Sequence, residues 1–449
     1  MNKYLLNFIN LNKNEILVGD YNNSFKKEEF IKLINKFYMS LKHYQDSNKS
    51  FGVGIYLSRD INYLAAIFSI LLSGNYFIPL NQAWPNKHLK RIIDYSKPKL
   101  IITNKNIFYK KKSLKVLTLK DIAAVKTKKE KLLISNSKVP EARLAYVIYT
   151  SGSSGEQKGV MISRKNFSSY LNWVIKYFKK KIKIKSLLIT GEMTFDIVMA
   201  DLANALAFRS TIYLTPQTNN LVKALQMLHE KKIDTIYGVP TTLKNLYLFS
   251  KLRKKRELKS LKNIFCGGDI FTYQLLKLIK SQSYNSKIFN MYGPTELSMN
   301  CLCQDLTRYK VKKSSEKIPN GQEFKHLNYK LFDQNKNSFN NYFGELVVSG
   351  DQCMQGYLGD KKKTKNAFIT YDNIKYYRTG DLFKKNKNIY FYEGRFDKQV
   401  KIKGYRIDLN TIDRFFSKLK FIKESKTILL ELKNNVKKII THIVLYDNL

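Results

Sequence analysis

The stretch that most constrains this fold is a polar turn, rich in glycine and serine, between two extended apolar runs. The residues from Leu144 to Tyr149 are mostly apolar and predict a buried strand. A second extended run, Val160 to Ile162, begins after a segment that reads Thr-Ser-Gly-Ser-Ser-Gly-Glu-Gln-Lys-Gly. The turn therefore joins two strands.

This loop has the chemistry of a phosphate-binding turn. Gly152 and Gly155 let the backbone point its N–H groups to one side, because no Cβ stands in the way. Lys158 adds a positive charge, and hydroxyl donors come from Thr150, Ser151, Ser153 and Ser154. A flexible Gly/Ser connector is the alternative interpretation. A Walker loop fits less well, because Lys158 lies three residues past Gly155 and a strand follows.

The composition indicates a folded protein with a strongly basic surface. The 449 residues allow two or three domains, and a hydrophobic content of 44% excludes a disordered chain. A net charge of +45 would ordinarily indicate nucleic acid or an anionic membrane as a partner. However, no basic motif with interleaved aromatic residues accompanies it, so we expect a solvated basic surface or a bias of nucleotide composition. The lysine clusters are Lys110–Lys112, Lys179–Lys185, Lys251–Lys262 and Lys361–Lys365.

The chain carries the features of a cytoplasmic protein. The first ten residues lack the pattern of a secretory signal, and the apolar stretch from Tyr63 to Leu72 is too short to span a membrane. The four cysteines, at 266, 301, 303 and 353, predict reduced thiols. The five histidines form no recognisable catalytic or metal-binding pattern, so we expect them to be structural or on the surface.

The first 140 residues alternate helical and extended patterns. This rhythm predicts βα units and a largely parallel sheet, and it resumes from Leu221 onward. The expected helices are 28–41, 61–72, 86–96 and 221–231, and the expected strands are 52–57, 76–80, 100–103 and 234–237. A turn is expected at Val239-Pro240.

Three sites stand out after the loop. Ser163 is a plausible N-cap for the helix that follows the second strand. Asp196 opens an apolar helical run and by itself reads as a helix cap or a surface carboxylate. Gly267, Gly268 and Asp269 follow the strand 263–266, where paired glycines either admit a flat ligand or form a plain turn.

The segment Asn290-Met-Tyr-Gly-Pro-Thr-Glu296 combines groups that suit a nucleotide. Tyr292 offers a ring face for a purine and Asn290 an amide for its edge. Thr295 offers a hydroxyl for phosphate, and Glu296 a hard oxygen ligand for Mg²⁺. Further along, Asp381 has two oxygens that could accept both hydroxyls of a vicinal diol, although an aspartate there is also common in turns.

Three of these segments together resemble the adenylate-forming superfamily of acyl-CoA synthetases, luciferases and nonribosomal peptide synthetase adenylation domains. They are the loop with Lys158-Gly-Val, the segment 290–296, and the run 392–407, which reads Tyr-Glu-Gly-Arg-Phe-Asp-Lys-Gln-Val-Lys-Ile-Lys-Gly-Tyr-Arg-Ile. Gln157 departs from the family, which has proline there. The resemblance is to amino-acid-activating members in particular, because Thr194-Phe-Asp196 matches their Phe-Asp signature.

The resemblance implies a role for each matching residue. Lys158, Thr295 and Glu296 would be catalytic, with Glu296 on Mg²⁺, and Asp196 would pair with the α-ammonium group of an amino acid. ATP would be bound by Thr150, Ser151, Gly152, Ser153, Ser154, Gly155, Gly268, Asp269, Asn290, Tyr292, Gly293, Asp381, Tyr392 and Arg395. The acid substrate would lie against Asp196, Ile197, Ala200, Gly238, Phe265, Gly267, Met291, Met299 and Asn300.

The resemblance also implies a domain plan of the α/β class. Residues 1–396 would form an adenylation core of βα layers with parallel sheets and a small β-rich subdomain, which includes the segments 344–350 and 356–358. Residues 397–449 would form a truncated α+β lid that turns about a hinge at Asp397. Family members continue to a late lysine that contacts the carboxylate and the α-phosphate, and no such motif occurs here. Loss of one such donor typically slows a reaction by about 10²- to 10³-fold.

We therefore expect ATP-dependent activation of a carboxylic acid, favouring an amino acid, to an acyl-adenylate with release of pyrophosphate. Transfer to a thiol would follow, on a separate phosphopantetheine carrier protein or on CoA. We expect no partner nucleic acid beyond ATP. Two alternatives remain open. One is an acyl-CoA or aryl-acid ligase, and the other is a catalytically impaired nucleotide-binding homologue without the late lysine.

Overall fold

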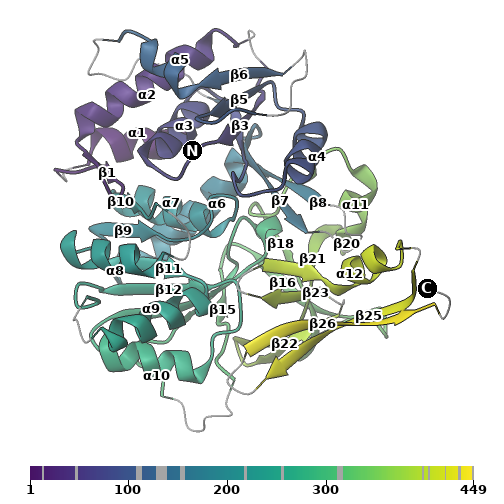
Figure 1. The fold of residues 1–449 in the computed structure, drawn as a ribbon. Helices are drawn as coiled ribbons and strands as arrows, with labels where there is room; N and C mark the ends of the chain where they lie inside the picture. Colours follow the sequence, from purple (N-terminus) through teal and green to yellow (C-terminus); the bar gives the residue numbers. More distant parts are fainter. Residues whose placement is uncertain are drawn as a thin grey trace.

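The computed structural model places most of the chain. It describes residues 1–12, 15–45, 49–107, 114–127, 139–151, 157–216, 220–253, 257–310, 317–396, 399–402, 405–419, 421–432 and 436–446. Within these residues the strands form three larger sheets and two short hairpins, arranged as Figure 1 shows.

The first sheet carries the hairpin of the glycine- and serine-rich loop near one edge. Its central strands are parallel, whereas β8 pairs antiparallel with both β7 and β19. In order across the sheet the strands are β19 (Gly356–Tyr357), β8 (Gln157–Ser163), β7 (Leu144–Ser151), β4 (Tyr76–Pro79), β3 (Gly52–Tyr56), β5 (Leu100–Thr103) and β6 (Lys115–Thr118). Its helices are α2 (Lys27–Lys42), α3 (Ile61–Leu72), α4 (Asn86–Ser96) and α5 (Leu119–Ala124).

The second sheet is also mainly parallel and carries the segment that ends at Glu296. Its strands are β15 (Gln322–Glu323), β14 (Leu302–Asp305), β13 (Lys287–Tyr292), β12 (Asn263–Gly267), β11 (Thr235–Gly238), β9 (Ser186–Ile189), β10 (Thr211–Leu214), β1 (Val18–Gly19) and β2 (Ser24–Phe25). Its helices are α1 (Asn2–Asn10), α6 (Arg164–Phe178), α7 (Ile197–Phe208), α8 (Leu221–Glu230), α9 (Pro240–Leu252) and α10 (Tyr273–Gln282), with the short 3₁₀ helix η1 (Thr295–Leu297).

The remaining elements are mostly antiparallel strands. The third sheet contains β17 (Ser338–Asn340), β16 (Asn328–Asp333), β18 (Phe343–Ser349), β21 (Ile374–Asn386), β20 (Phe368–Tyr371) and β22 (Ile389–Arg395), with α11 (Lys361–Asn366) beside it. The C-terminal part consists of the hairpin β23 (Gln399–Ile402) and β24 (Tyr405–Asp408), helix α12 (Leu409–Phe416), and the hairpin β25 (Ile422–Leu432) and β26 (Val436–Leu445).

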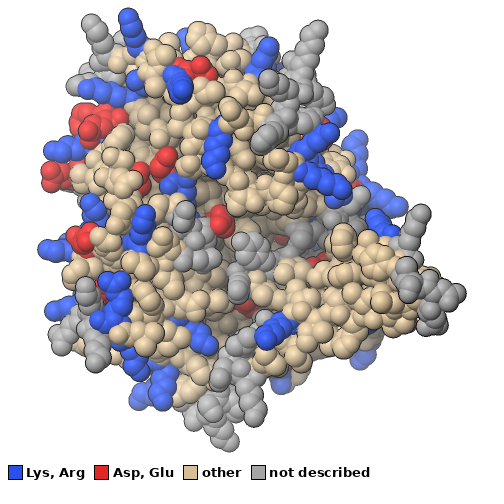
Figure 2. All heavy atoms as spheres, viewed as in Figure 1, with Lys and Arg blue, Asp and Glu red and all other residues tan. Residues whose placement is uncertain are grey.

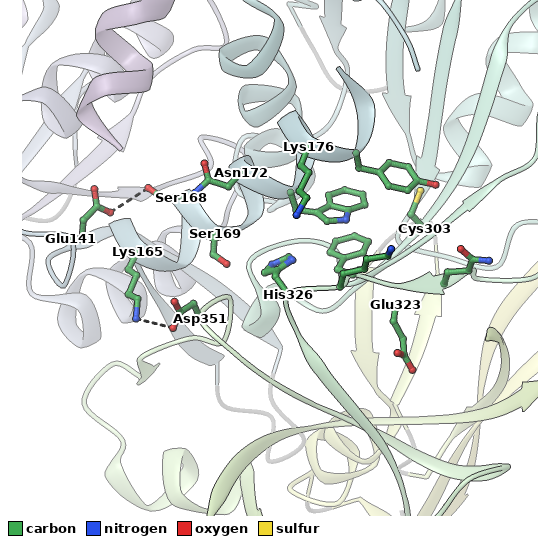
Figure 3. Close-up of a pocket in the computed structure, with 15 residues that line it drawn as sticks. Glu141, Lys165, Ser168, Ser169, Asn172, Lys176, Cys303, Glu323, His326 and Asp351 are labelled. Atoms are coloured by element: carbon green, nitrogen blue, oxygen red, sulfur yellow. Dashed lines mark hydrogen bonds and ion pairs between the residues drawn. The ribbon is translucent and has the colours of Figure 1, made fainter. Parts of the chain in front are cut away.

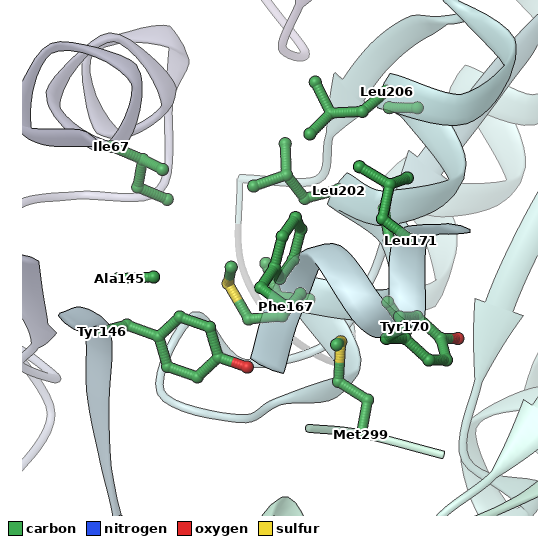
Figure 4. Packing of buried hydrophobic residues seen from close by; sticks show 14 of the residues in the cluster. Ile67, Ala145, Tyr146, Phe167, Tyr170, Leu171, Leu202, Leu206 and Met299 are labelled. Carbon is green, nitrogen blue, oxygen red and sulfur yellow. The ribbon is translucent and has the colours of Figure 1, made fainter. Parts of the chain in front are cut away.

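The main core lies between the first two sheets and is filled by α3, α6 and α7. Figure 4 shows Ile67 of α3, Phe167 and Leu171 of α6, and Leu202 of α7 converging there, and all are buried. Helix α3 buries almost every side chain because its sequence is apolar on all sides. Helix α6 begins where predicted, since the Ser163 hydroxyl accepts from the Asn166 N–H.

The sequence predicted the fold class and the first βα units correctly. Helices α2, α3 and α4 and strands β3, β4 and β5 lie within one or two residues of their expected positions. Two expectations were wrong. Val239-Pro240 begins α9, with proline in the first helical turn, where its missing N–H costs nothing. Residues 356–357 pair with β8 in the first sheet, not with the β-rich sheet.

The surface is basic over a wide area. In Figure 2, Lys and Arg side chains are spread around the visible face and not gathered into one patch. The expected cluster Lys110–Lys112 lies outside the described residues. Among the helices that the structure describes, none is long and apolar enough to span a bilayer.

Arg164 gives a test of how α6 is fixed to the first sheet. Its guanidinium is fully buried and donates to Asn2 Oδ1 at 2.7 Å, to the Leu71 carbonyl at 2.7 Å and to the Asn75 carbonyl at 3.1 Å. Arg164→Leu leaves buried acceptors unpaired, so we expect the free energy of unfolding in urea to fall by about 2–4 kcal/mol.

Lys165→Leu is the matched control. Lys165 is the exposed neighbour of Arg164, and among the described residues its side chain forms only an exposed ion pair, with Asp351. We expect its free energy of unfolding to change by no more than about 1 kcal/mol. Equal losses in the two variants would contradict the assignment.

Candidate functional site

The β7–β8 hairpin places the glycine- and serine-rich loop. The strands pair up to its base, with Thr150 opposite Lys158 and Ser151 opposite Gln157. The predicted strand–loop–strand arrangement is therefore confirmed. The side chain of Ser151 and residues 152–156, which include Gly152, Ser153, Ser154 and Gly155, lie outside the described part of the structure. Their phosphate-binding role stays a prediction.

Lys158, Tyr357 and Glu296 form a row that links the hairpin to the second sheet. The Lys158 ammonium lies 5.0 Å from the centre of the Tyr357 ring. The Tyr357 hydroxyl donates to Glu296 Oε1 at 2.9 Å, and the Glu296 side chain is buried. Strand β19, which holds Tyr357, is thus the element that brings these two predicted residues together.

The turn after β13 is packed too tightly for side chains at its first position. A Cβ on Gly293 would lie 2.3 Å from the Met299 carbonyl oxygen and 2.5 Å from Asn300 Cα. Thr295, partly exposed, begins η1 next to Glu296. Ser298 and Met299 follow with φ values of 52° and 91°, so the chain reverses within a few residues.

Gln352 fixes this turn from outside. Its side chain is fully buried, and its amide nitrogen donates to the carbonyls of Leu297 at 2.6 Å and Asn300 at 2.5 Å. The Ser298 hydroxyl donates to the Gln352 carbonyl at 2.8 Å. The Gln352 side chain therefore holds the turn that carries Glu296 and Asn300, because it satisfies two backbone carbonyls of that turn.

A buried ion pair, to which a phenol donates a hydrogen bond, joins the second and third sheets. The Tyr292 hydroxyl donates to Asp381 Oδ2 at 2.5 Å, and Arg395 forms an ion pair with Asp381 Oδ1. Asp381 and Arg395 are opposite residues on β21 and β22. Burial, and then the Asp381 charge, raises the pKa of Tyr292, so this phenol stays protonated and can donate. Tyr392 packs edge-on against Phe383, whose ring also contacts Tyr292.

Asp196 precedes α7 but does not cap it. It occupies the N-cap position in a helical conformation, and its side chain makes no capping hydrogen bond. Instead its negative charge helps to raise the pKa values of Tyr146, Tyr170 and Tyr237, although burial is the larger cause for each. The carboxylate therefore lies near three buried phenols.

Two of these phenols, those of Tyr237 and Tyr170, form a polar wall with Asn300. The Tyr237 hydroxyl donates to Asn300 Oδ1 at 3.0 Å, and the Asn300 amide donates to the Tyr170 hydroxyl at 2.9 Å. The Tyr146 hydroxyl is buried and has no hydrogen-bond partner among the described residues. A buried hydroxyl without a partner is costly, so this one is a candidate for contact with a bound ligand.

Of the other predicted pocket residues, Gly267 lies against the Tyr237 hydroxyl and most of the rest belong to the main core. A Cβ on Gly267 would lie 2.8 Å from the Tyr237 hydroxyl and 2.7 Å from the Met291 carbonyl oxygen. The main core cluster contains Ala200, Phe265, Met291 and Met299, all buried, and the partly buried Ile197 packs against it. Gly238 ends β11, directly after Tyr237.

Some of the residues predicted to contact adenine already form hydrogen bonds within the protein. Gly268 is exposed with φ of +86°, and Asp269 Oδ1 accepts from the Ile270 N–H at 2.8 Å. Asn290 is buried, and its amide donates to the Pro319 carbonyl at 2.8 Å. Asn290 thus has a structural contact in this chain, and its role toward a purine stays a prediction. Asp397 lies outside the described residues.

Sequence reasoning missed Tyr357, Tyr237, Tyr170 and Gln352. Tyr357 lies in a two-residue strand, which is too short to predict from its pattern. Tyr237 and Tyr170 looked like ordinary core residues of a strand and a helix. Among the described residues, no group of three or more His, Cys, Asp or Glu side chains could hold a metal ion.

Gly293→Ala tests how tightly the turn is built. Because the added Cβ would meet backbone atoms at 2.3 and 2.5 Å, we expect a loss of at least about 2 kcal/mol in the free energy of unfolding. Gly359→Ala is the control, since its φ is +73° but no atom lies within 4 Å of the added Cβ. We expect it to cost about 1 kcal/mol. Similar costs would argue against a close-packed turn.

Comparison with known proteins agrees with this architecture. The family model described as AMP-binding enzyme matches residues 27–358. Zwittermicin A synthase ZmaJ of Bacillus cereus is 30% identical over 374 residues, which is 80% of this chain and 70% of that protein. D-alanine–D-alanyl carrier protein ligase of Staphylococcus epidermidis is 26% identical over 369 residues, covering 81% of this chain and 72% of the ligase.

Solved structures share the fold. A nonribosomal peptide synthetase protein that contains adenylation and PCP domains superposes with a TM-score of 0.83 and 19% sequence identity, covering 99% of this chain and 76% of that one. The family model spans most of the present chain, including the hairpin, the turn after β13 and Tyr357. We conclude that the chain belongs to the AMP-binding enzyme family, as an adenylate-forming ligase.

Proposed function

We propose that this ligase activates an amino acid as its aminoacyl-adenylate and then transfers the acyl group to a thiol. In the first step, a carboxylate oxygen of the amino acid attacks the α-phosphorus of ATP. The bond from that phosphorus to the bridging oxygen breaks, and pyrophosphate leaves. No protein nucleophile is needed, so the side chains act by positioning the reactants and neutralising charge.

The nucleotide would lie where the first, second and third sheets meet. Asp381, held by Tyr292 and Arg395, is fixed in one orientation and would accept the ribose hydroxyls. Lys158 would approach the phosphates from the base of the hairpin. Thr295 and the loop after Ser151 would add donors for phosphate oxygens, and Gly268 would border the adenine.

Glu296 fits the requirements of a Mg²⁺ ligand. It is a buried carboxylate that Tyr357 orients through a 2.9 Å hydrogen bond, and Mg²⁺ commonly takes one or two carboxylates together with phosphate oxygens and water. When bound, the metal would neutralise charge on the leaving pyrophosphate. The chain's own part is to hold the Glu296 carboxylate beside the triphosphate.

The observation that carries the amino acid assignment is the position of Asp196. This carboxylate makes no capping bond to α7, and after burial its charge contributes to the raised pKa values of Tyr146, Tyr170 and Tyr237, the last two of which are hydrogen-bonded to Asn300. An α-ammonium group is the substrate feature that would pair with it. Because the Tyr237 hydroxyl lies beside Gly267, we infer a substrate with a short side chain.

The acceptor in the second step would be the phosphopantetheine thiol of a separate carrier protein. Its support is the likeness to a relative whose name specifies a D-alanyl carrier protein. The thiol would attack the acyl carbon and release AMP. A hinge at Asp397 between residues 1–396 and 397–449 would let the C-terminal part change position between the two steps.

An acyl-CoA or aryl-acid ligase is the second candidate. The observation that favours it is the apolar character of Phe265, Met291 and Met299, which would suit an acid without an ammonium group. The two candidates predict different effects of removing the Asp196 charge.

Asp196→Ala should reduce amino-acid-dependent exchange of pyrophosphate into ATP by about 100-fold or more, because a buried ammonium would lose its partner. The measurement compares short amino acids with hexanoate and benzoate in the same variant. Exchange with the acids that lack an ammonium group should change little. If amino acid exchange survives in the variant, or if only hexanoate or benzoate supports exchange in the parent chain, the amino acid proposal fails.

Asp381→Asn should weaken ATP binding by about 10- to 100-fold, because hydrogen bonds to a charged group are lost. Calorimetric titration with ATP measures this directly. Asp333→Asn is the control, because Asp333 lies on β16, where within the described part of the chain its side chain accepts only from the nearby N–H groups of Asn335 and Lys336. Circular dichroism checks that both variants are folded. Unchanged affinity in folded Asp381→Asn would remove Asp381 from the ribose site.

A further inference from the structure

A cavity lies on the outer face of α6, and none of the residues assigned to ATP or to the acid substrate lines it. It has a volume of about 710 Å³ and is bounded by α6, by residues 322–326, and by Glu141 and Asp351. Figure 3 shows Lys176, His326 and Cys303 around it, with Ser168 and Asn172 along the helix. Small-ligand sites in proteins typically have volumes of about 300–1,000 Å³.

The base of this cavity is a set of stacked aromatic rings. The ring centre of Trp173 lies 3.5 Å from that of Phe324 and 5.0 Å from that of Tyr177, with interplanar angles of 12° and 18°. His326 continues the set, because its ring is nearly parallel to that of Phe324 at 6.2 Å. Because Trp173 and Phe324 cover each other's faces and are only 8% and 1% exposed, a bound molecule would meet the edges of this stack. Ring edges favour contact with the flat face of another aromatic ring.

The charges at the rim leave a positive excess. Each acidic side chain that lines the cavity already has a cationic partner. Glu141 pairs with the N-terminal ammonium, Glu323 with Lys385, and Asp351 with Lys165. In contrast, Lys176 and Lys325, both exposed, form no ion pair with the described residues.

We propose that this cavity binds a small organic anion with a flat aromatic body, which would lie against the edges of the Trp173–Phe324 stack with its charge near Lys176 and Lys325. The concave shape, the aromatic base and the unpaired lysines each favour this class of ligand. A cation would meet the two lysines, and a neutral molecule would gain only the apolar contact. The proposal does not depend on the adenylation activity.

The test uses 2-naphthalenesulfonate as the probe, because a sulfonate cannot be activated as a carboxylic acid. The chain has two tryptophans, so Trp84→Phe leaves Trp173 as the only one and makes its fluorescence a reporter inside the cavity. We expect saturable quenching of Trp173 with a stoichiometry of one, confirmed by calorimetry on the parent chain. The neutral 2-naphthol and the cationic 2-naphthylmethylamine should bind at least about tenfold more weakly.

A double variant, Lys176→Ala with Lys325→Ala, should weaken sulfonate binding by about tenfold. The matched control is Lys179→Ala with Lys180→Ala, which removes the same charge from exposed residues just past α6 that do not line the cavity. It should leave the affinity unchanged. Saturating ATP should not displace the probe.

Three results would overturn the proposal. They are the absence of saturable binding, displacement of the probe by ATP, and equal affinity in the two double variants. Because ATP binding and pyrophosphate exchange are measured separately, failure here is distinguishable from failure of the proposed function. The lysines removed are exposed, so both variants should fold, and circular dichroism verifies this.

Discussion

The buried contact among Tyr292, Asp381 and Arg395 is the interaction on which the candidate site depends. Removing two opposite charges from water is costly, and the cost is offset only if their remaining hydrogen-bonding capacity is satisfied. Here burial keeps the pKa of Tyr292 high, so its phenol stays protonated and donates to the second oxygen of Asp381. Because Tyr292 ends a strand of the second sheet and Asp381 and Arg395 belong to the third, the contact also fixes how these sheets meet.

Two smaller interactions complete the same geometry. The hydrogen bond from Tyr357 to Glu296 joins the edge of the first sheet to the turn after β13, and Gln352 satisfies the carbonyls within that turn. The carboxylates of Asp381 and Glu296 are therefore both oriented by hydrogen bonds from neighbouring side chains. This is the arrangement that electrostatic catalysis requires, because donors that are already in place need no rearrangement during the reaction.

The sequence predicted the local parts of this arrangement and not the contacts between them. The hairpin around Lys158 was predictable because loop composition and flanking strands act over a few residues. Tyr292 and Asp381 are separated by 89 residues, and only a resemblance to a family placed both at one ligand. Tyr237 could not be recognised, because strands buried on both faces show no alternation that tells which side chain faces a ligand. The role of β19 was misjudged for a related reason, since a two-residue strand carries no periodic signal.

The position of β19 has a consequence for recombining this protein with its relatives. The chain leaves the first sheet after β8, builds the second sheet except for β1 and β2 together with part of the third, and then returns to cover the β8 edge with Gly356 and Tyr357. A chimera with one crossover between residues 163 and 350 would take Lys158 from one parent and Tyr357 from the other. A segment exchanged between relatives therefore has to contain both β8 and β19, although almost two hundred residues of sequence lie between these two paired strands.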